Sequence, residues 1–182
     1  MIDIHFQWAP VPKEAYTGDD LSFDVMIEYR DGNGERVLWG LKCKYADSLI
    51  SQEHNTEAYR RIFEASRDTF LNDYRFYTQP SFNQLFRNQL LACSYERRHG
   101  VRCYCGLFCS GSDERALDAA RRYQAALAGG SRGFSILTYR DFIETAQRLR
   151  CDWRTRKWTM LLWARYLGLE LSEEAYQAHG EG

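Results

Sequence analysis

Apolar and polar residues alternate at the start of the chain, where residues 2–8 read Ile-Asp-Ile-His-Phe-Gln-Trp. Such alternation is typical of a strand with one buried face. Residues 9–20, with two prolines and a glycine, predict a loop. Four further strands are expected, over residues 21–30, 35–45, 101–109 and 134–137.

Apolar residues at helical spacing and polar capping residues predict the rest of the chain. Ser81 and Ser112 are the expected N-caps of two helices, and Thr138 and Asp141 are expected to open another. The predicted helices cover about residues 53–71, 81–98, 112–129, 138–149, 152–167 and 172–178. Strands followed by alternating helices and strands indicate an α/β fold.

Length and composition set the broad class of the protein. A chain of 182 residues predicts one domain, 1–182, with a core over about 2–137 and C-terminal helices over about 138–178. No apolar run approaches the ~20 residues that span a bilayer, and no signal-peptide pattern opens the chain. We therefore expect a cytoplasmic protein without a membrane partner, whose six cysteines are reduced. The net charge of −1 gives no argument for nucleic acid.

Two stretches of the chain carry recognisable motifs. The first is a hairpin, in which Ser22-Phe23-Asp24 opens one strand and Gly40-Leu41-Lys42-Cys43-Lys44-Tyr45 ends the next. The second is Gln84-Leu85-Phe86-Arg87-Asn88-Gln89-Leu90-Leu91-Ala92 on a predicted helix. Together they resemble the PD-(D/E)XK nuclease superfamily, and within it a bacterial family with the patterns S/T-x-F-D, G-I-E-x-K-Y and Q-L-x-R-x-x-L-L-A. The resemblance runs from about residue 2 to residue 167.

The resemblance implies a restriction-endonuclease-like core, a mixed β-sheet flanked by helices, and a role in hydrolysing DNA. It assigns Asp24 as a ligand of Mg²⁺ (or Mn²⁺) and Lys44 as the lysine that orients the attacking water. It also places Gln84 and Arg87 beside the site, where Gln84 can bond a water or phosphate and Arg87 can clamp a phosphate. DNA is then the expected partner.

Lys42 departs from this pattern, because the family has a glutamate there. A protonated ammonium cannot ligate a metal, and two unit charges about 4 Å apart repel by roughly 4 kcal/mol at an intermediate dielectric. For Asp24 to face Lys42 and Lys44, the loop between the strands must have an odd length or a bulge. We therefore expect a nuclease fold with an impaired metal site, in which Lys42 is a cation beside the former catalytic residues.

Other functional interpretations stay open. A pseudo-nuclease could bind nucleic acid or assemble with a partner, since Lys42 and Lys44 on one strand face could neutralise phosphate without a metal. A single base change turns a Glu codon into a Lys codon, so a recently inactivated copy is a third interpretation. The family core also opens with a helix, whereas this sequence begins at the first strand, which suggests a truncated relative or an added C-terminal helix. Assembly as a homo-oligomer or with a partner protein is a further open interpretation.

Several remaining residues have a structural interpretation that is simpler than a functional site. Glu57 and Glu64 could supply a relocated carboxylate, but solvated helix residues are the simpler explanation. Zinc binding by the cysteines is disfavoured, because alternate residues of a strand are ~6.6 Å apart and these share a face typical of a core: Val101, Cys103, Cys105, Leu107 and Cys109. Aromatic residues among arginines near the C-terminus could stack on a nucleic acid, but core packing is expected for Trp153, Trp158 and Trp163.

Overall fold

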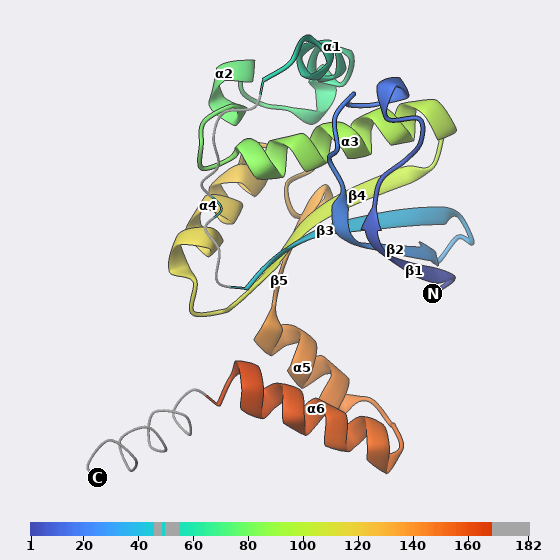
Figure 1. Cartoon of the computed structure of the whole chain (residues 1–182), viewed down its shortest axis with the longest axis vertical. Helices are drawn as coiled ribbons and strands as arrows, with labels where there is room; N and C mark the ends of the chain where they lie inside the picture. The colour runs from blue at the N-terminus through green and yellow to red at the C-terminus, as the bar shows by residue number, and fades with distance from the viewer. Residues whose placement is uncertain (46–48, 50–54, 169–182) are drawn as a thin grey trace.

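A five-stranded mixed sheet forms the centre of the protein (Figure 1). The computed structural model describes residues 1–45, 49 and 55–168. The strands lie in the order of the chain, with β1, β2 and β3 antiparallel and β3, β4 and β5 parallel. Their bounds are β1 Asp3–Trp8, β2 Phe23–Arg30, β3 Arg36–Lys44, β4 Arg102–Cys109 and β5 Phe134–Thr138. The expected α/β fold with a mixed sheet is confirmed.

Helices cover the sheet and extend beyond it. The α-helices are α1 Glu57–Ala65, α2 Tyr74–Tyr77, α3 Asn83–His99, α4 Glu114–Ala125, α5 Tyr139–Arg148 and α6 Trp153–Tyr166. Short 3₁₀ turns cover Lys13–Ala15, Arg67–Thr69 and Gly130–Arg132. Helix α3 packs on β3 and β4, and α1 packs on α3. Helices α5 and α6 pack on each other as a hairpin that projects from the end of the molecule opposite to α1 and α2 (Figure 1).

The core lies between α3 and the sheet and is unusually aromatic above α3. Neighbouring ring centroids there are 4.9–6.0 Å apart, and the rings come from α1, α2, α3 and the segment after α1: Phe63, Phe70, Tyr74, Tyr77 and Phe86. On the sheet side, Cys103, Cys105 and Cys109 are buried, which confirms their expected core position. Burial raises the pKa of each of these thiols, so they remain protonated at neutral pH.

The β2–β3 pairing sets the position of the motif residues. Val25 pairs with Leu41 and Arg30 pairs with Arg36, so the connecting loop is residues 31–35. Five residues is an odd length, as required for Asp24 and Lys42 to share a face. The register therefore confirms the expected geometry of the hairpin.

Several local predictions needed correction. Asp113, rather than Ser112, caps α4 by accepting a hydrogen bond from the backbone of Ala116, and Ser81 does not cap α3, which begins after Phe82. The helix expected over 53–71 is shorter, because α1 ends at Ala65, and α2 was not predicted. Thr138 and Asp141 open α5 as expected, and they form a capping box there.

Two predictions concern the C-terminal region. The expected helix over 172–178 lies outside the described residues. The prediction that the α6 tryptophans pack in the core is wrong, since Trp153, Trp158 and Trp163 are 70%, 50% and 39% exposed. Across the described ranges, none of the helices combines the length and apolarity needed to cross a bilayer.

Candidate functional site

Asp24 and Lys42 meet where β2 begins and β3 nears its end. The antiparallel ladder stops at the Val25–Leu41 pair, and the carboxylate of Asp24 then accepts a hydrogen bond from the backbone N–H of Cys43 at 2.8 Å. The Lys42 ammonium lies 2.9 Å from Oδ1 and 2.9 Å from Oδ2 of the same carboxylate. The side chains of Lys42 and Asp24 are only 25% and 18% exposed. The lysine therefore binds across both oxygens that a metal would need.

Gln7 completes the surroundings of this carboxylate, and sequence reasoning did not identify it. Its Nε2 lies 3.4 Å from Asp24 Oδ1, and its Oε1 accepts a hydrogen bond from Ser22 at 3.3 Å. Gln7 has a φ of 50°, a left-handed conformation that costs a non-glycine residue about 1 kcal/mol or more. Strained backbone recurs at functional sites. The positive φ cannot be read from the alternating pattern of β1, which explains the omission.

Two other motif residues have a packing role. A Cβ on Gly40 would lie 2.4 Å from the ring of Phe23, so the phenyl ring rests directly on the glycine backbone. Phe23 is fully buried. The pattern of Phe-Asp on one strand and Gly on the next is therefore explained by a close contact that holds Asp24 at the start of β2.

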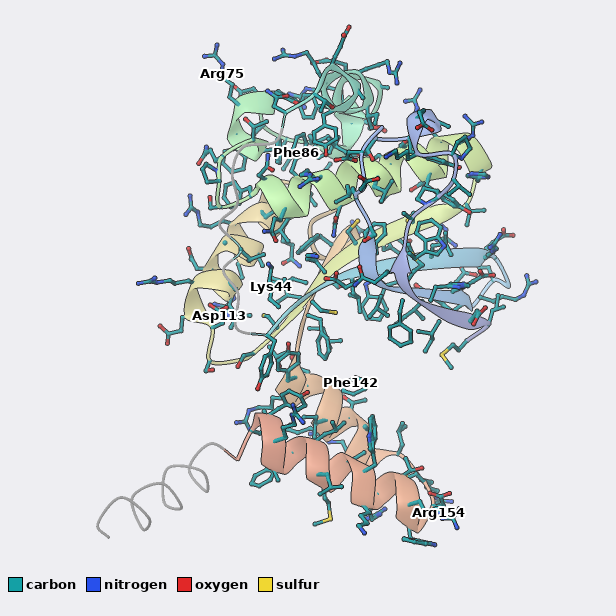
Figure 2. The ribbon with its side chains drawn as sticks, viewed as in Figure 1. Lys44, Arg75, Phe86, Asp113, Phe142 and Arg154 are labelled. Carbon is teal, nitrogen blue, oxygen red and sulfur yellow. The ribbon has the colours of Figure 1, made fainter. Side chains whose placement is uncertain are left out.

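Lys44 lies two residues beyond Lys42 on the same face of β3, the face that carries α3 (Figure 2). It is 4% exposed. Its backbone carbonyl accepts a hydrogen bond from the Tyr139 hydroxyl at 2.7 Å, which attaches the start of α5 to the end of β3. Between the lysines, burial and then Asp24 raise the pKa of Cys43 to about 11, so this thiol is not an available nucleophile at neutral pH.

Arg87 is bound to other protein groups. Its Nε donates to the Tyr59 hydroxyl at 2.8 Å, and its second terminal nitrogen lies 2.9 Å from Asp19 Oδ2. The Tyr59 hydroxyl also donates to Asp19. Asp19, 68 residues away from Arg87 in sequence, was not foreseen as its partner.

The three groups shift one another's pKa values. Burial opposes the ionisation of Asp19, but hydrogen bonds from Tyr59, Thr17 and Arg87 outweigh it and leave the pKa of this carboxyl below its ordinary value. Burial and the bond to Asp19 raise the pKa of Tyr59. Burial lowers the pKa of Arg87, but its bonds to Asp19 and Tyr59 reverse that effect, so the net pKa is raised. This cluster contains an ion pair that is charged at neutral pH, and it joins the loop before β2 to α1 and α3.

Gln84 lies one turn before Arg87 on α3. Its Oε1 is buried and has no hydrogen-bond partner among the described residues. A buried oxygen without a donor costs about 1–3 kcal/mol. The structure therefore leaves an acceptor near the start of α3, whereas Arg87 is already engaged.

The described residues around Asp24 do not fit a divalent metal. Both carboxylate oxygens are engaged, and the part of the chain that the structure describes holds no group of three or more His, Cys, Asp and Glu side chains placed to bind an ion. Mg²⁺ requires hard oxygen ligands, usually including one or two carboxylates. Glu57 and Glu64 are exposed on α1, and Glu28 is bound to Arg36 at 2.8 Å. We therefore derive no metal-dependent step from this site.

A cavity of about 830 Å³ opens beyond the ends of β4 and β5, between α4 and α5. Arg121 and Arg140 contribute positive charge to its lining. Hydroxyl groups line it as well, from Ser110, Ser112, Ser135 and Thr138. Asp141, the acid among the described residues of its lining, accepts hydrogen bonds from the backbone and the hydroxyl of Thr138 in the capping box of α5. In open α/β sheets the crevice beyond the carboxyl ends of the strands is a common ligand position.

The fold and this hairpin define the class of protein. A family model described as the PD-(D/E)XK nuclease superfamily matches residues 1–168, and the chain belongs to this family. No curated protein and no solved structure matches the chain.

Proposed function

We propose that this protein is a nuclease-fold protein in which Lys42 blocks metal-dependent hydrolysis of DNA. The observation that carries the proposal is the Lys42 ammonium 2.9 Å from both oxygens of Asp24. The ammonium occupies the carboxylate that the superfamily uses for its metal. It also repels the ion, because two unit charges about 4 Å apart at an intermediate dielectric cost about 4 kcal/mol and a divalent ion doubles that cost.

The test is cleavage of plasmid and single-stranded DNA with Mg²⁺ or Mn²⁺. Five proteins are compared: the unchanged chain, Asp24→Ala, Lys42→Glu, Lys42→Met, and Lys42→Glu combined with Asp24→Ala. We expect cleavage by Lys42→Glu alone, because only that variant regains two adjacent carboxylates. Lys42→Met is the matched control, since it removes the cation without adding a ligand. Metal-dependent cleavage by the unchanged chain, abolished by Asp24→Ala, would show that the proposal is wrong.

A second candidate function, binding of nucleic acid without hydrolysis, is supported by the cavity at the ends of β4 and β5. Arg121 and Arg140 line it, and Asp141 in its lining is engaged in the capping box of α5. Lysine and arginine side chains that neutralise phosphates release counterions, so such binding weakens steeply with salt and needs no metal.

This second function is tested by anisotropy of labelled DNA in EDTA over a range of salt. We expect Arg121→Gln with Arg140→Gln to weaken binding and to reduce the salt dependence by about two phosphate contacts. Arg115→Gln is the control, because Arg115 is exposed on α4 and does not line the cavity. Equal binding by the control and the double variant would rule out the cavity as the binding surface.

A further inference from the structure

An aromatic pocket lies where the α5–α6 hairpin meets the ends of β3 and β4. Its volume is about 310 Å³, and none of the described residues that line it carries a charge at neutral pH. Six of the lining side chains are aromatic: Tyr45, Phe108, Tyr139, Phe142, Trp158 and Tyr166. Pockets that bind small ligands have volumes of about 300–1,000 Å³ and are lined mainly by apolar and aromatic side chains. This pocket therefore has the size and lining of a site for a flat aromatic group.

The aromatic rings are held in place by one another and still present open faces. The ring centroid of Tyr139 lies 4.6 Å from that of Phe108 and 5.3 Å from that of Tyr166. Two other rings of the lining remain in contact with solvent, because Phe142 is 41% exposed and Trp158 is 50% exposed. The pocket thus combines a fixed aromatic base with accessible rings, on which a planar ligand can stack.

A second hollow, of about 420 Å³, shares part of this aromatic lining. Three tyrosines line both spaces: Tyr45, Tyr139 and Tyr166. Arg165 lines the second hollow, is exposed, and places its guanidinium carbon 5.6 Å from the centroid of one of these rings, Tyr166. The acid of this hollow, Asp113, accepts a hydrogen bond from the backbone of Ala116 as the cap of α4. A positively charged surface therefore adjoins the aromatic pocket.

This surface continues into the larger cavity beyond the ends of β4 and β5. Ser110, Ser112 and Tyr166 line both the second hollow and that cavity. Arg121 and Arg140 supply the positive charge of the larger cavity. An aromatic pocket is thus followed by two spaces that contain arginines and hydroxyl groups.

The aromatic pocket lies on the face of the sheet opposite to Lys42. Neighbouring residues of a strand point to opposite faces, so Cys43, which lines the pocket, faces away from Lys42. A molecule in the pocket is therefore separated by the sheet from the Asp24–Lys42 pair. The pocket is suited to binding and has no part in the hydrolysis that Lys42 is proposed to block.

An unpaired nucleobase fits this combination better than other occupants do. A base offers a flat ring that stacks on aromatic side chains, and it is joined to phosphates that arginines bind. A base inside a duplex cannot enter such a pocket unless it is extruded from its stack. An apolar side chain of a partner protein would fill the pocket but would leave the adjoining arginines without an opposite charge.

We propose that the aromatic pocket holds one unpaired base of a single-stranded nucleic acid. Phe142 and Trp158 supply the open rings for stacking, and the phosphates beside that base lie against Arg165 and the arginines of the larger cavity. The inference rests on the proposed binding of nucleic acid without hydrolysis. It adds that the protein prefers single strands to duplexes, because only a single strand offers its bases for stacking.

The test is fluorescence anisotropy of dye-labelled DNA in EDTA with three ligands of equal length: a single strand, a single strand that carries no bases, and a duplex. We expect the unchanged protein to bind the ordinary single strand about tenfold more tightly than the base-free strand, because the latter has nothing to stack. Trp158→Ala should remove this difference. Trp158→Phe keeps a ring and should retain most of it. The affinity for the duplex should be the same in all three proteins.

Trp153→Ala is the matched control. Trp153 begins the same helix, is 70% exposed, and is not among the residues that line these spaces, so its removal should leave the tenfold difference intact. Equal affinities of the unchanged protein for the two single strands, or a difference that survives Trp158→Ala, would overturn the base pocket. If the duplex still binds in that case, the proposed surface of Arg121 and Arg140 stands. Failure of all three DNAs to bind would contradict both proposals.

Discussion

The protein contains two aspartate–cation pairs of nearly identical geometry and very different surroundings. Asp24–Lys42 and Asp19–Arg87 both close at 2.9 Å, and all four side chains are 16–25% exposed. The first pair joins strands that backbone hydrogen bonds already hold together. The second joins a loop to two helices through Tyr59. Distance and burial therefore do not show what an ion pair contributes. Its role depends on which elements it joins and on whether other bonds already hold them together.

This difference assigns the two pairs different roles. Asp19 and Arg87 stabilise the position of α3 over the sheet, and neither is available to a ligand. Asp24 and Lys42 add little to a hairpin that is already paired, so their importance is chemical. In the proposed function, Lys42 determines whether Asp24 can bind a metal.

The largest effect on stability is expected from Arg87→Ala. The change leaves Asp19 half-buried without its charge partner, and we expect a loss of about 2–3 kcal/mol in the free energy of unfolding, below the 3–5 kcal/mol of a fully buried pair. Urea denaturation measures it. Arg87→Lys is the control, because it keeps the charge but cannot reach both Asp19 and Tyr59. Its free energy of unfolding should lie between those of the unchanged chain and Arg87→Ala. If Arg87→Ala loses less stability than Lys42→Met, the Asp24–Lys42 pair, and not the Asp19–Arg87 pair, is the structural one.

Gly40→Ala tests whether packing, rather than the ion pair, holds the end of the β2–β3 hairpin. The added Cβ would lie 2.4 Å from the buried Phe23 ring, which has no open space to move into. We expect a loss of about 2 kcal/mol in thermal or urea unfolding. Gly32→Ala is the matched control, since nothing lies within 4 Å of its Cβ position, and it should change stability by less than about 0.5 kcal/mol.

The acid dependence of stability should reflect Asp19. Its folded pKa is below the unfolded value of 3.8, so its contribution is complete above pH 3.8 and is lost as the pH falls from there through the folded pKa. Asp19→Asn should therefore be less stable than the unchanged chain at neutral pH and should lose less stability on acidification through that range. Urea midpoints measured from pH 6 to pH 2 report the slopes. If the urea midpoints of the two proteins fall in parallel with pH, Asp19 does not contribute to the acid dependence of stability.

The smallest effect is expected from Lys42→Met. The strands keep their backbone pairing, and Asp24 keeps its bonds to Cys43 and Gln7, so the free energy of unfolding should change by less than about 1 kcal/mol. The measurement is the same urea titration as for Arg87→Ala. A loss as large as for Arg87→Ala would mean that Lys42 is structural.

The sequence allowed the fold to be predicted much further than the site. The positions of the strands along the chain follow from local alternation. The shared face of Asp24 and Lys42 requires an odd loop or a bulge, because a period of two fixes which residues face each other. The Arg87–Asp19 contact depends on how α3 crosses the loop, which no local pattern encodes. The same holds for the positive φ of Gln7. The α6 tryptophans look like core residues, and only the packed structure shows that they face outward.

The central claim is that Lys42 excludes a metal from Asp24. The most direct measurement is the shift in unfolding free energy produced by 10 mM Mg²⁺ in the unchanged chain, Lys42→Met and Lys42→Glu. We predict no shift in the first two and a stabilisation of about 1.4 kcal/mol in Lys42→Glu for a dissociation constant near 1 mM. An equal shift in the unchanged chain, removed by Asp24→Ala, would contradict the account.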